Sequence, residues 1–224
     1  MRLTHVRAPD GAVVGELDLV PSKIVAIGQN YRLHAQEMGK GIPAEPLLFL
    51  KAPSAMIGDG GAIERPAGFA RVDHEAELGV VIGTRARRVA REDALAHVLG
   101  YTCVNDVTVR ELQQRDGQWA RAKGFDTFCP VGPRVVAGLD PSDLAIRCRV
   151  NGVLRQDSRT RDLIFDVPTL IAFVSAHMTL EPGDLLSTGT PAGVGDLAVG
   201  DEVEVEIEGI GVLRNRVVAR PEGR

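Results

Sequence analysis

The sequence has few aromatic residues, no block of basic residues and no long apolar run. Only 4% of its 224 residues are aromatic, and its formal net charge is −4. This composition argues against nucleic acid as a partner. No apolar run approaches the roughly 20 residues that a membrane-spanning helix needs, and residues 1–10 contain no apolar signal-peptide segment. We therefore expect neither a nucleic acid nor a membrane as a partner.

Cysteine is scarce too. The three cysteines, Cys103, Cys129 and Cys148, are odd in number and widely spaced. Neither a disulfide framework nor a zinc-binding spacing is visible among them. We therefore predict three buried thiols and a reducing, cytoplasmic location.

What the sequence does contain predicts an α+β, mainly β fold. A hydrophobic content of 44% is enough for a sizeable core, and 224 residues make one large domain or one domain with a small annex. Many short strand-like segments, few helical ones and no Gly-x-Gly-x-x-Gly motif argue against a doubly wound sheet. Residues 1–20 predict a hairpin annex that turns at Asp10-Gly11. Residues 21–224 predict the main domain.

Residues 72–83 predict a single β-strand with two glutamates on one face. Alternate residues from position 74 to position 82 form one face, and Glu75 and Glu77 lie together on the other, about 7 Å apart by strand rise. Carboxylates this close repel each other unless one is protonated or a cation lies between them. The pair is either half of a divalent-metal site or the charged outer face of an edge strand. Asp106 lies inside another apolar strand, residues 100–109, and is the natural third oxygen ligand.

Two further segments carry candidate functional residues, each with an ordinary structural alternative. A helix from Tyr31 to about Met38, with Asn30 as its N-cap, would place His34 and Glu37 on one surface. A carboxylate beside an imidazole suits a general base that activates water, although an exposed His/Glu pair would give the same spacing. Lys51 ends an apolar strand and is either an anchor for a substrate carboxylate or an ordinary strand-end charge.

Taken together, these segments resemble the fumarylacetoacetate hydrolase family over residues 23–218. The resemblance rests on six motifs in order: Gly28-Gln29-Asn30-Tyr31 with His34 and Glu37, Phe49-Leu50-Lys51, His74-Glu75-Ala76-Glu77-Leu78, Asn105-Asp106, Lys123, and the Gly-rich segment 188–195. Each motif alone is weak, but six in this order are specific. The short chain is most similar to the small single-domain members of the acylpyruvase and oxaloacetate decarboxylase type.

The resemblance implies a β-roll with a few peripheral helices, a homodimer and a metal site. In that site Glu75, Glu77 and Asp106 would bind Mg²⁺ or Mn²⁺. Three carboxylates make a hard oxygen site that leaves positions for water and substrate, as Mg²⁺ prefers.

The resemblance also implies roles for the other candidate residues. His34 and Glu37 would form a water-activating dyad, and Lys123 would lie beside the negative charge that develops on the substrate. A second set would hold the carboxylate end of the substrate: Arg110, Gln113 and Thr190.

Two positions depart from the family pattern. Gln29 stands where a basic residue is common, and Ala52 separates Lys51 from the proline that usually follows it. These departures concern local substrate contacts rather than the metal ligands.

The resulting hypothesis is a metal-dependent hydrolase that cleaves a C–C bond in acylpyruvates, a class of 2-oxo acid, through an enolate of pyruvate. An oxaloacetate-type decarboxylase or a 2-hydroxyhepta-2,4-diene-1,7-dioate isomerase would use the same enolate and remains an alternative. A protein that binds metal and oxo acid without catalysis is a more remote one.

Overall fold

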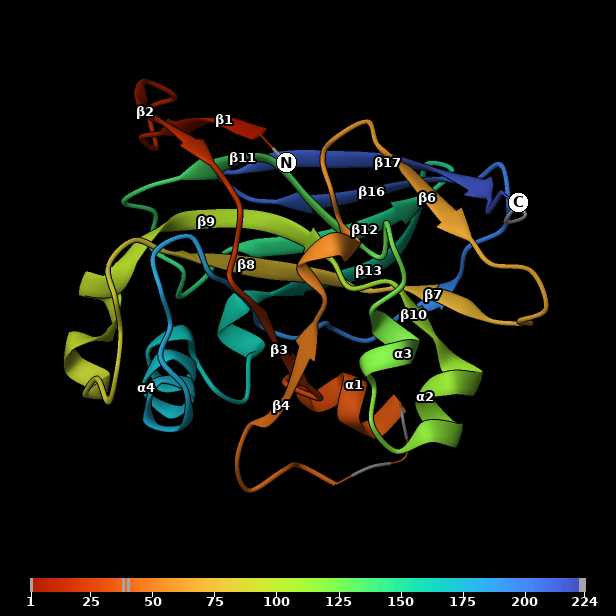
Figure 1. Ribbon diagram of the computed structural model, residues 1–224, viewed down its shortest axis with the longest axis horizontal. Helices are drawn as coiled ribbons and strands as arrows, with labels where there is room; N and C mark the ends of the chain where they lie inside the picture. Colours follow the sequence, from red (N-terminus) through yellow and green to blue (C-terminus); the bar gives the residue numbers. More distant parts are fainter. Residues whose placement is uncertain (1, 38, 40, 222–224) are drawn as a thin grey trace.

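The computed structural model describes residues 2–37, 39 and 41–221, and its main element is a nine-stranded, curled sheet (Figure 1). Eight strands follow the order β2-β1-β11-β9-β8-β14-β3-β4, and β5 pairs with β11. In chain order they are β1 (Arg2–Arg7), β2 (Val13–Asp18), β3 (Ile24–Gly28), β4 (Leu47–Lys51), β5 (Met56–Ile57), β8 (Ala76–Ile82), β9 (Val98–Asn105), β11 (Cys129–Val136) and β14 (Leu185–Ser187).

Two smaller sheets complete the β-structure. The five-stranded sheet has the order β13 (Val153–Arg159), β12 (Ala145–Val150), β16 (Glu202–Ile207), β17 (Gly211–Ala219) and β6 (Ala62–Arg65). The three-stranded sheet has the order β10 (Thr108–Val109), β7 (Val72–His74) and β15 (Gly195–Asp196). The predicted mainly β, α+β fold is therefore confirmed.

The helices are short and lie at the ends of the large sheet (Figure 1). Three α-helices gather at one end: α1 (Arg32–Glu37), α2 (Arg110–Asp116) and α3 (Ala120–Lys123). The longer helix α4 (Val167–His177) packs beside the 3-10 helix η2 (Arg91–His97), and two further 3-10 turns are η1 (Pro53–Ala55) and η3 (Thr160–Asp162). The side chain of Asp166 accepts a hydrogen bond from the backbone of Thr169 and so caps α4.

The core lies between the large sheet and the five-stranded sheet. Leu78 and Val80 of β8 belong to the same buried cluster as Ile146 of β12 and Val205 of β16. The other face of β8 is buried as well, with Val81 in a second apolar cluster. Because β8 lies between β9 and β14, it is a central strand, and the alternative of an exposed edge strand is wrong.

The predicted strand 72–83 is interrupted at Glu75, which lies between β7 and β8. At Glu75 the backbone hydrogen bonds between neighbouring strands are missing, and a side chain and a loop provide the partners instead. The backbone N–H of Glu75 donates to the side chain of Asn105, at 2.9 Å, and its carbonyl accepts from the N–H of Asp106, at 2.9 Å. Because buried backbone groups need partners, these bonds fix the position of Glu75 although it lies outside a strand.

The N-terminal hairpin turns near Asp10-Gly11 as expected, since β1 and β2 pair antiparallel. Strand β1 also pairs in parallel with β11, so β1 and β2 extend the large sheet. The division into an annex and a main domain stays a prediction. The three cysteines are free and buried, as predicted.

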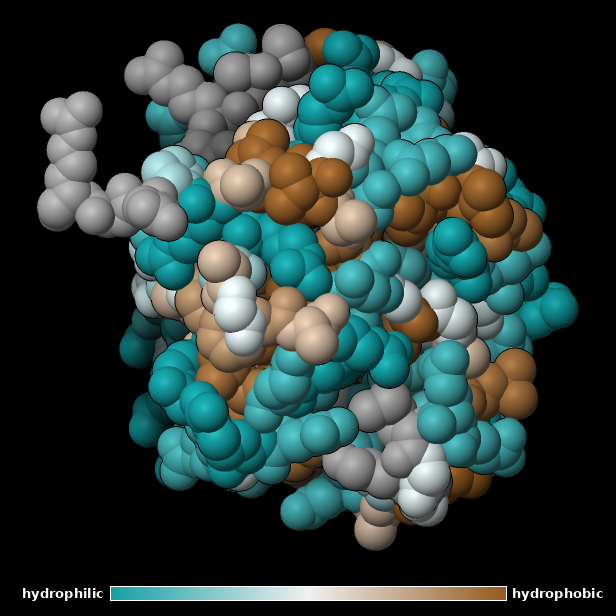
Figure 2. Space-filling view, turned by 90° about the vertical axis from the view of Figure 1, so that its right-hand side faces the viewer, coloured by the Kyte–Doolittle hydropathy of each residue, from teal (hydrophilic) through white to brown (hydrophobic). Residues whose placement is uncertain are grey.

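Figure 2 shows one side of the molecule as mainly hydrophilic, with separate apolar patches between the polar residues. Among the described residues, no helix combines the length and the apolar character that crossing a membrane requires.

Candidate metal and substrate site

Three carboxylates meet at the point where the central strands end. Glu75 lies between β7 and β8, Glu77 lies two residues further on, and Asp106 directly follows β9. One carboxylate oxygen from each of the three residues lies within 4.8 Å of the others, and all three residues are buried. The predicted ligand set is thus brought together by strands that are neighbours in the sheet, β8 and β9.

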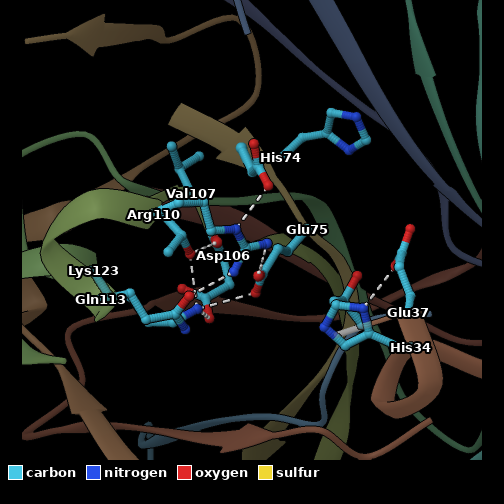
Figure 3. A network of polar contacts seen from close by, with 12 residues as sticks. His34, Glu37, His74, Glu75, Asp106, Val107, Arg110, Gln113 and Lys123 are labelled. Carbon is cyan, nitrogen blue, oxygen red and sulfur yellow. Dashed lines mark hydrogen bonds and ion pairs between the residues drawn. The ribbon is translucent and has the colours of Figure 1, made fainter. Parts of the chain in front are cut away.

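Three cations surround two of these carboxylates, and Figure 3 shows two of the cations, Lys123 and Arg110. Lys123 Nζ donates to Glu75 Oε2 at 3.0 Å and to Asp106 Oδ2 at 2.5 Å, while Arg110 Nη2 lies 2.6 Å from Glu75 Oε1. Lys51 Nζ donates to Asp106 Oδ1 at 2.5 Å. Burial by itself raises the pKa of Glu75, but the charges of Lys123 and Arg110 outweigh it and hold that pKa well below its usual range.

Glu77 differs from its two neighbours. Its Oε2 accepts hydrogen bonds from the Ser187 hydroxyl and from the backbone N–H of Gly189, which are neutral donors. Burial, together with the charges of Asp106 and Glu75, raises the pKa of Glu77 to about 8. A carboxylate placed in this way needs a further positive charge to stay ionised.

The triad therefore fits a divalent cation on the chemistry of its donors. Carboxylate oxygens are the ligands that hard divalent ions such as Mg²⁺ and Mn²⁺ prefer. The raised pKa of Glu77 marks the place where that cation would be most stabilising. Glu75, Glu77 and Asp106 are the residues that would hold it.

The predicted dyad lies on α1, beside this cluster (Figure 3). His34 Nδ1 lies 3.1 Å from Glu37 Oε2, and the His34 ring is buried. A carboxylate at this position favours the tautomer with the proton on Nδ1, so that Nε2 can accept a proton. Met38, the predicted end of the helix, lies outside the described residues.

The predicted N-cap function of Asn30 does not agree with the hydrogen bonds that it makes. Its side chain accepts from the N–H of Phe165 and donates to the carbonyl oxygens of Phe165 and Thr188. Asn30 therefore joins the start of α1 to two distant loops. A sequence motif alone does not indicate these tertiary partners.

A cavity of about 420 Å³ opens onto the cluster. Seven of the predicted site residues line it: His34, Glu75, Glu77, Arg110, Gln113, Lys123 and Thr190. The imidazole, the carboxylates and the cations can therefore act on one small ligand.

The three predicted substrate-binding residues differ in the hydrogen bonds they already make. Arg110 donates from Nε to Asp73 at 2.7 Å and from Nη1 to Gln113 Oε1 at 2.8 Å. Because Gln113 accepts through its oxygen, its amide nitrogen can donate to a ligand. The hydroxyl of Thr190 donates to the carbonyl of Ala76, at 2.9 Å.

Lys51 lies behind the site rather than in it. Its side chain is fully buried, and its ammonium group donates to Asp106, to the carbonyl of Val107 and to the carbonyl of Lys123. A direct contact with the substrate carboxylate, as predicted, does not fit this position. The physical reason is that three acceptors already surround the ammonium group, one of them a carboxylate of the triad.

Sequence reasoning missed two features of this site. Asp73 is fully buried and pairs with both Arg71 and Arg110. It lies among polar residues in the sequence, so no local pattern indicates its burial. Phe49 and Trp119 form an edge-to-face pair, with ring centroids 5.1 Å apart, on the cavity wall. Lys123 Nζ lies 4.8 Å from the centroid of the Phe49 ring. The cavity thus combines a charged side with an aromatic one.

Comparisons with known proteins show the family of this chain. Residues 23–218 match the family model described as fumarylacetoacetate (FAA) hydrolase C-terminal. The chain is 46% identical over 210 residues to a mitochondrial oxaloacetate tautomerase of Bos taurus, a match that covers 88% of this chain and 67% of the relative.

Two solved structures are similar over nearly the whole chain. The 5-carboxymethyl-2-hydroxymuconate delta-isomerase from Mycobacterium smegmatis is 43% identical, with a TM-score of 0.88 over 99% of this chain and 100% of that one. The fumarylpyruvate hydrolase from Pseudomonas aeruginosa, solved in complex with Mn²⁺ and pyruvate, is 33% identical, with a TM-score of 0.85 over 89% of this chain and 91% of that one.

Proposed function

Since the chain belongs to the fumarylacetoacetate hydrolase family, we propose that it is a divalent-metal-dependent enzyme that cleaves a C–C bond in acylpyruvates. The observation that carries this proposal is the His34–Glu37 pair, 3.1 Å apart, beside a buried carboxylate triad, with His34, Glu75 and Glu77 lining one cavity. A hydrolase needs a base for water as well as a site that stabilises an enolate, and this cavity contains groups for both tasks.

In this reaction water adds to the carbonyl carbon of the acyl group. His34 Nε2 accepts the proton of that water, and Glu37 stabilises the imidazolium that forms. The bond between the acyl carbon and the methylene carbon then breaks, and its electron pair passes to the pyruvate part as an enolate. Protonation of the methylene carbon gives pyruvate, and the acyl group leaves as a carboxylic acid.

The substrate's oxo acid end lies against the charged side of the cavity in this proposal. A divalent cation held by Glu75, Glu77 and Asp106 would supply Lewis-acid stabilisation of the enolate. Lys123 contributes a second positive charge near the same position. Gln113 donates its amide N–H to the carboxylate of the substrate, and Arg110 holds Gln113 in place.

A second candidate is enol–keto conversion or decarboxylation of oxaloacetate, or isomerisation of an unsaturated dicarboxylate. The bovine relative is named an oxaloacetate tautomerase, and the Mycobacterium smegmatis neighbour is an isomerase. These reactions share the enolate but need no attacking water. The role of His34 therefore discriminates between the two candidates.

The test compares wild type with His34→Ala on an acylpyruvate and on oxaloacetate. Pyruvate, CO₂ and released acid are measured separately, and the enol and keto forms of oxaloacetate are followed by their ultraviolet absorbance. We expect His34→Ala to lower kcat for acylpyruvate hydrolysis by about 10²- to 10⁴-fold, the usual contribution of a general base. His177→Ala is the matched control, since His177 lies on the exposed side of α4. Undiminished hydrolysis in His34→Ala would contradict water activation by this dyad. Turnover of oxaloacetate without acylpyruvate cleavage in wild type would favour the second candidate.

A further inference from the structure

One loop, residues 187–193, holds parts of both halves of the site. At its start, the Ser187 hydroxyl and the Gly189 N–H donate to the carboxylate of Glu77. At its end, the Gly193 N–H donates to the carboxylate of Glu37, at 3.2 Å from Oε1 and 3.3 Å from Oε2. The position of the dyad relative to the triad therefore depends on the conformation of this loop.

The middle of the loop is bound by a residue outside the cavity, Gln156 of β13. Gln156 is fully buried. Its Nε2 donates to Thr190 Oγ1 and to the carbonyl of Pro191, both at 2.8 Å, and its Oε1 accepts from the N–H of Ala76 at 3.0 Å. The orientation of the amide is unambiguous, because a carbonyl can only accept and a backbone N–H can only donate.

Gln156 also contacts the other neighbour of Glu75. His74 Nδ1 lies 3.2 Å from Gln156 Oε1, and the His74 ring points away from the carboxylate cluster (Figure 3). Since Oε1 is an acceptor, Nδ1 of His74 carries the proton. One side-chain amide thus holds the residues on both sides of Glu75 and, at its other end, the loop that contacts Glu37.

The loop packs directly on β13 at Gly193. This glycine has a φ of +97°, and a Cβ built on it would lie 2.1 Å from the carbonyl oxygen of Arg155. Only glycine allows this approach. Arg155, the neighbour of Gln156 in β13, therefore fixes the end of the loop at Gly193, and this is the end that bonds to Glu37.

We propose that Gln156 is a positioning residue that sets the His34–Glu37 dyad relative to the metal triad through the loop 187–193. Gln156 touches neither the cavity nor the dyad itself, so it acts through Thr190, Pro191 and the N–H of Gly193. The catalytic consequence rests on the proposed function, in which the dyad activates water. The effect of Gln156 on the position of the dyad can be measured whether or not the protein catalyses this reaction.

The first measurement tests whether the dyad keeps its position, without any assay of activity. It records the hydrogen-exchange rate of the backbone amides of α1, the helix that carries the dyad, in the full chain. We compare wild type with Gln156→Ala and Gly193→Ala, and with Gly200→Ala as the matched control. Gly200 has a φ of +99°, almost that of Gly193, but no atom lies within 4 Å of the position that a Cβ would take there. We expect exchange in α1 to rise about tenfold in the first two variants, as loss of a hydrogen bond to a carboxylate predicts, and to stay at the wild-type rate in the control.

Unchanged α1 exchange in both Gln156→Ala and Gly193→Ala would overturn the proposal. An equal rise over all segments would overturn it too, because that result indicates a general loss of stability. If Gln156→Ala fails to fold, Gln156→Met takes its place, because methionine keeps most of the side-chain volume and removes only the amide that bonds to Thr190, Pro191 and Ala76.

The second measurement is a double-mutant cycle on acylpyruvate hydrolysis. Gln156→Ala and Gly193→Ala should each lower kcat by about 10- to 100-fold, as expected for a misplaced catalytic group. In a Glu37→Ala background the same changes should cost much less, because the part of the loss that passes through the Gly193 N–H to the Glu37 carboxylate is already absent. Equal losses in both backgrounds would contradict the proposal. If wild type cleaves no acylpyruvate, the proposed function fails, while the exchange result still decides the role of Gln156.

Discussion

Replacing Lys51 by methionine tests how the charges of the site are balanced. The ammonium group of Lys51 is fully buried and lies 2.5 Å from Asp106 Oδ1 and 2.6 Å from the carbonyl of Lys123. Methionine has a similar shape but no charge and no donor. The change therefore leaves a buried carboxylate oxygen and a carbonyl without this partner.

The expected loss of stability is large. Removing one partner of a buried ion pair costs about 3–5 kcal/mol. For a domain of this size, each 1 kcal/mol shifts the unfolding temperature by about 2–4 °C, so Lys51→Met should lower it by about 6–20 °C without added metal. Arg85→Met is the control, because the Arg85–Glu181 pair is exposed on both sides and should contribute about 1 kcal/mol or less.

In contrast to the stability, the affinity of Lys51→Met for a divalent cation should rise. Without Lys51, one positive charge fewer lies beside Asp106, so a divalent cation meets less repulsion. We expect Mn²⁺ to bind at least about tenfold more tightly to Lys51→Met than to wild type, measured by titration calorimetry. An unfolding temperature within about 2 °C of wild type, together with unchanged Mn²⁺ affinity, would refute the assignment of Lys51 as the counter-charge of Asp106.

Three further predictions concern metal, cavity shape and pH. Chelation of divalent ions should abolish turnover and lower the unfolding temperature, and Mg²⁺ or Mn²⁺ should restore both. Gly28→Ala would place a Cβ 2.9 Å from Trp119 Cζ3, so we expect a raised KM with little change in metal affinity, measured by steady-state kinetics and titration. Burial raises the pKa of Asp184, but hydrogen bonds from Lys23 and its other donors lower it more, and the net pKa is below the usual value. Because the folded pKa is lowered, the contribution of Asp184 to stability is present above about pH 4 and is lost as the pH falls through the folded pKa. The unfolding temperature of wild type should therefore fall more steeply than that of Asp184→Asn below about pH 4.

The homodimer that the resemblance implies stays a prediction, which size-exclusion chromatography with light scattering can test directly.

Some features of this protein follow from the sequence because they depend on local geometry. The alternation in residues 76–82 predicts one core face of β8, since side chains on a strand alternate, and the structure buries the opposite face as well. The spacing of His34 and Glu37 predicts their contact, because residues three apart are neighbours on a helix. The place of Asp106 in the carboxylate cluster was predictable because a lone carboxylate in an apolar strand needs a partner.

Other features were decided by the tertiary structure, since they join residues that are distant in the chain. The Gly193 N–H bonds to Glu37 over a separation of 156 residues, and Lys51 bonds to Asp106 over 55. No periodicity or local spacing relates such positions. The same applies to Gln156, whose residue type indicates nothing until the loop and the interruption at Glu75 fold around its amide.

The sequence by itself thus determined which chemical groups the site contains: carboxylates, an imidazole and cations. Only the tertiary structure decided which carboxylate each cation balances, and it alone left Glu77 with neutral donors. The physical reason is that charge balance in a buried site depends on distances between separate strands. Sequence order does not determine those distances.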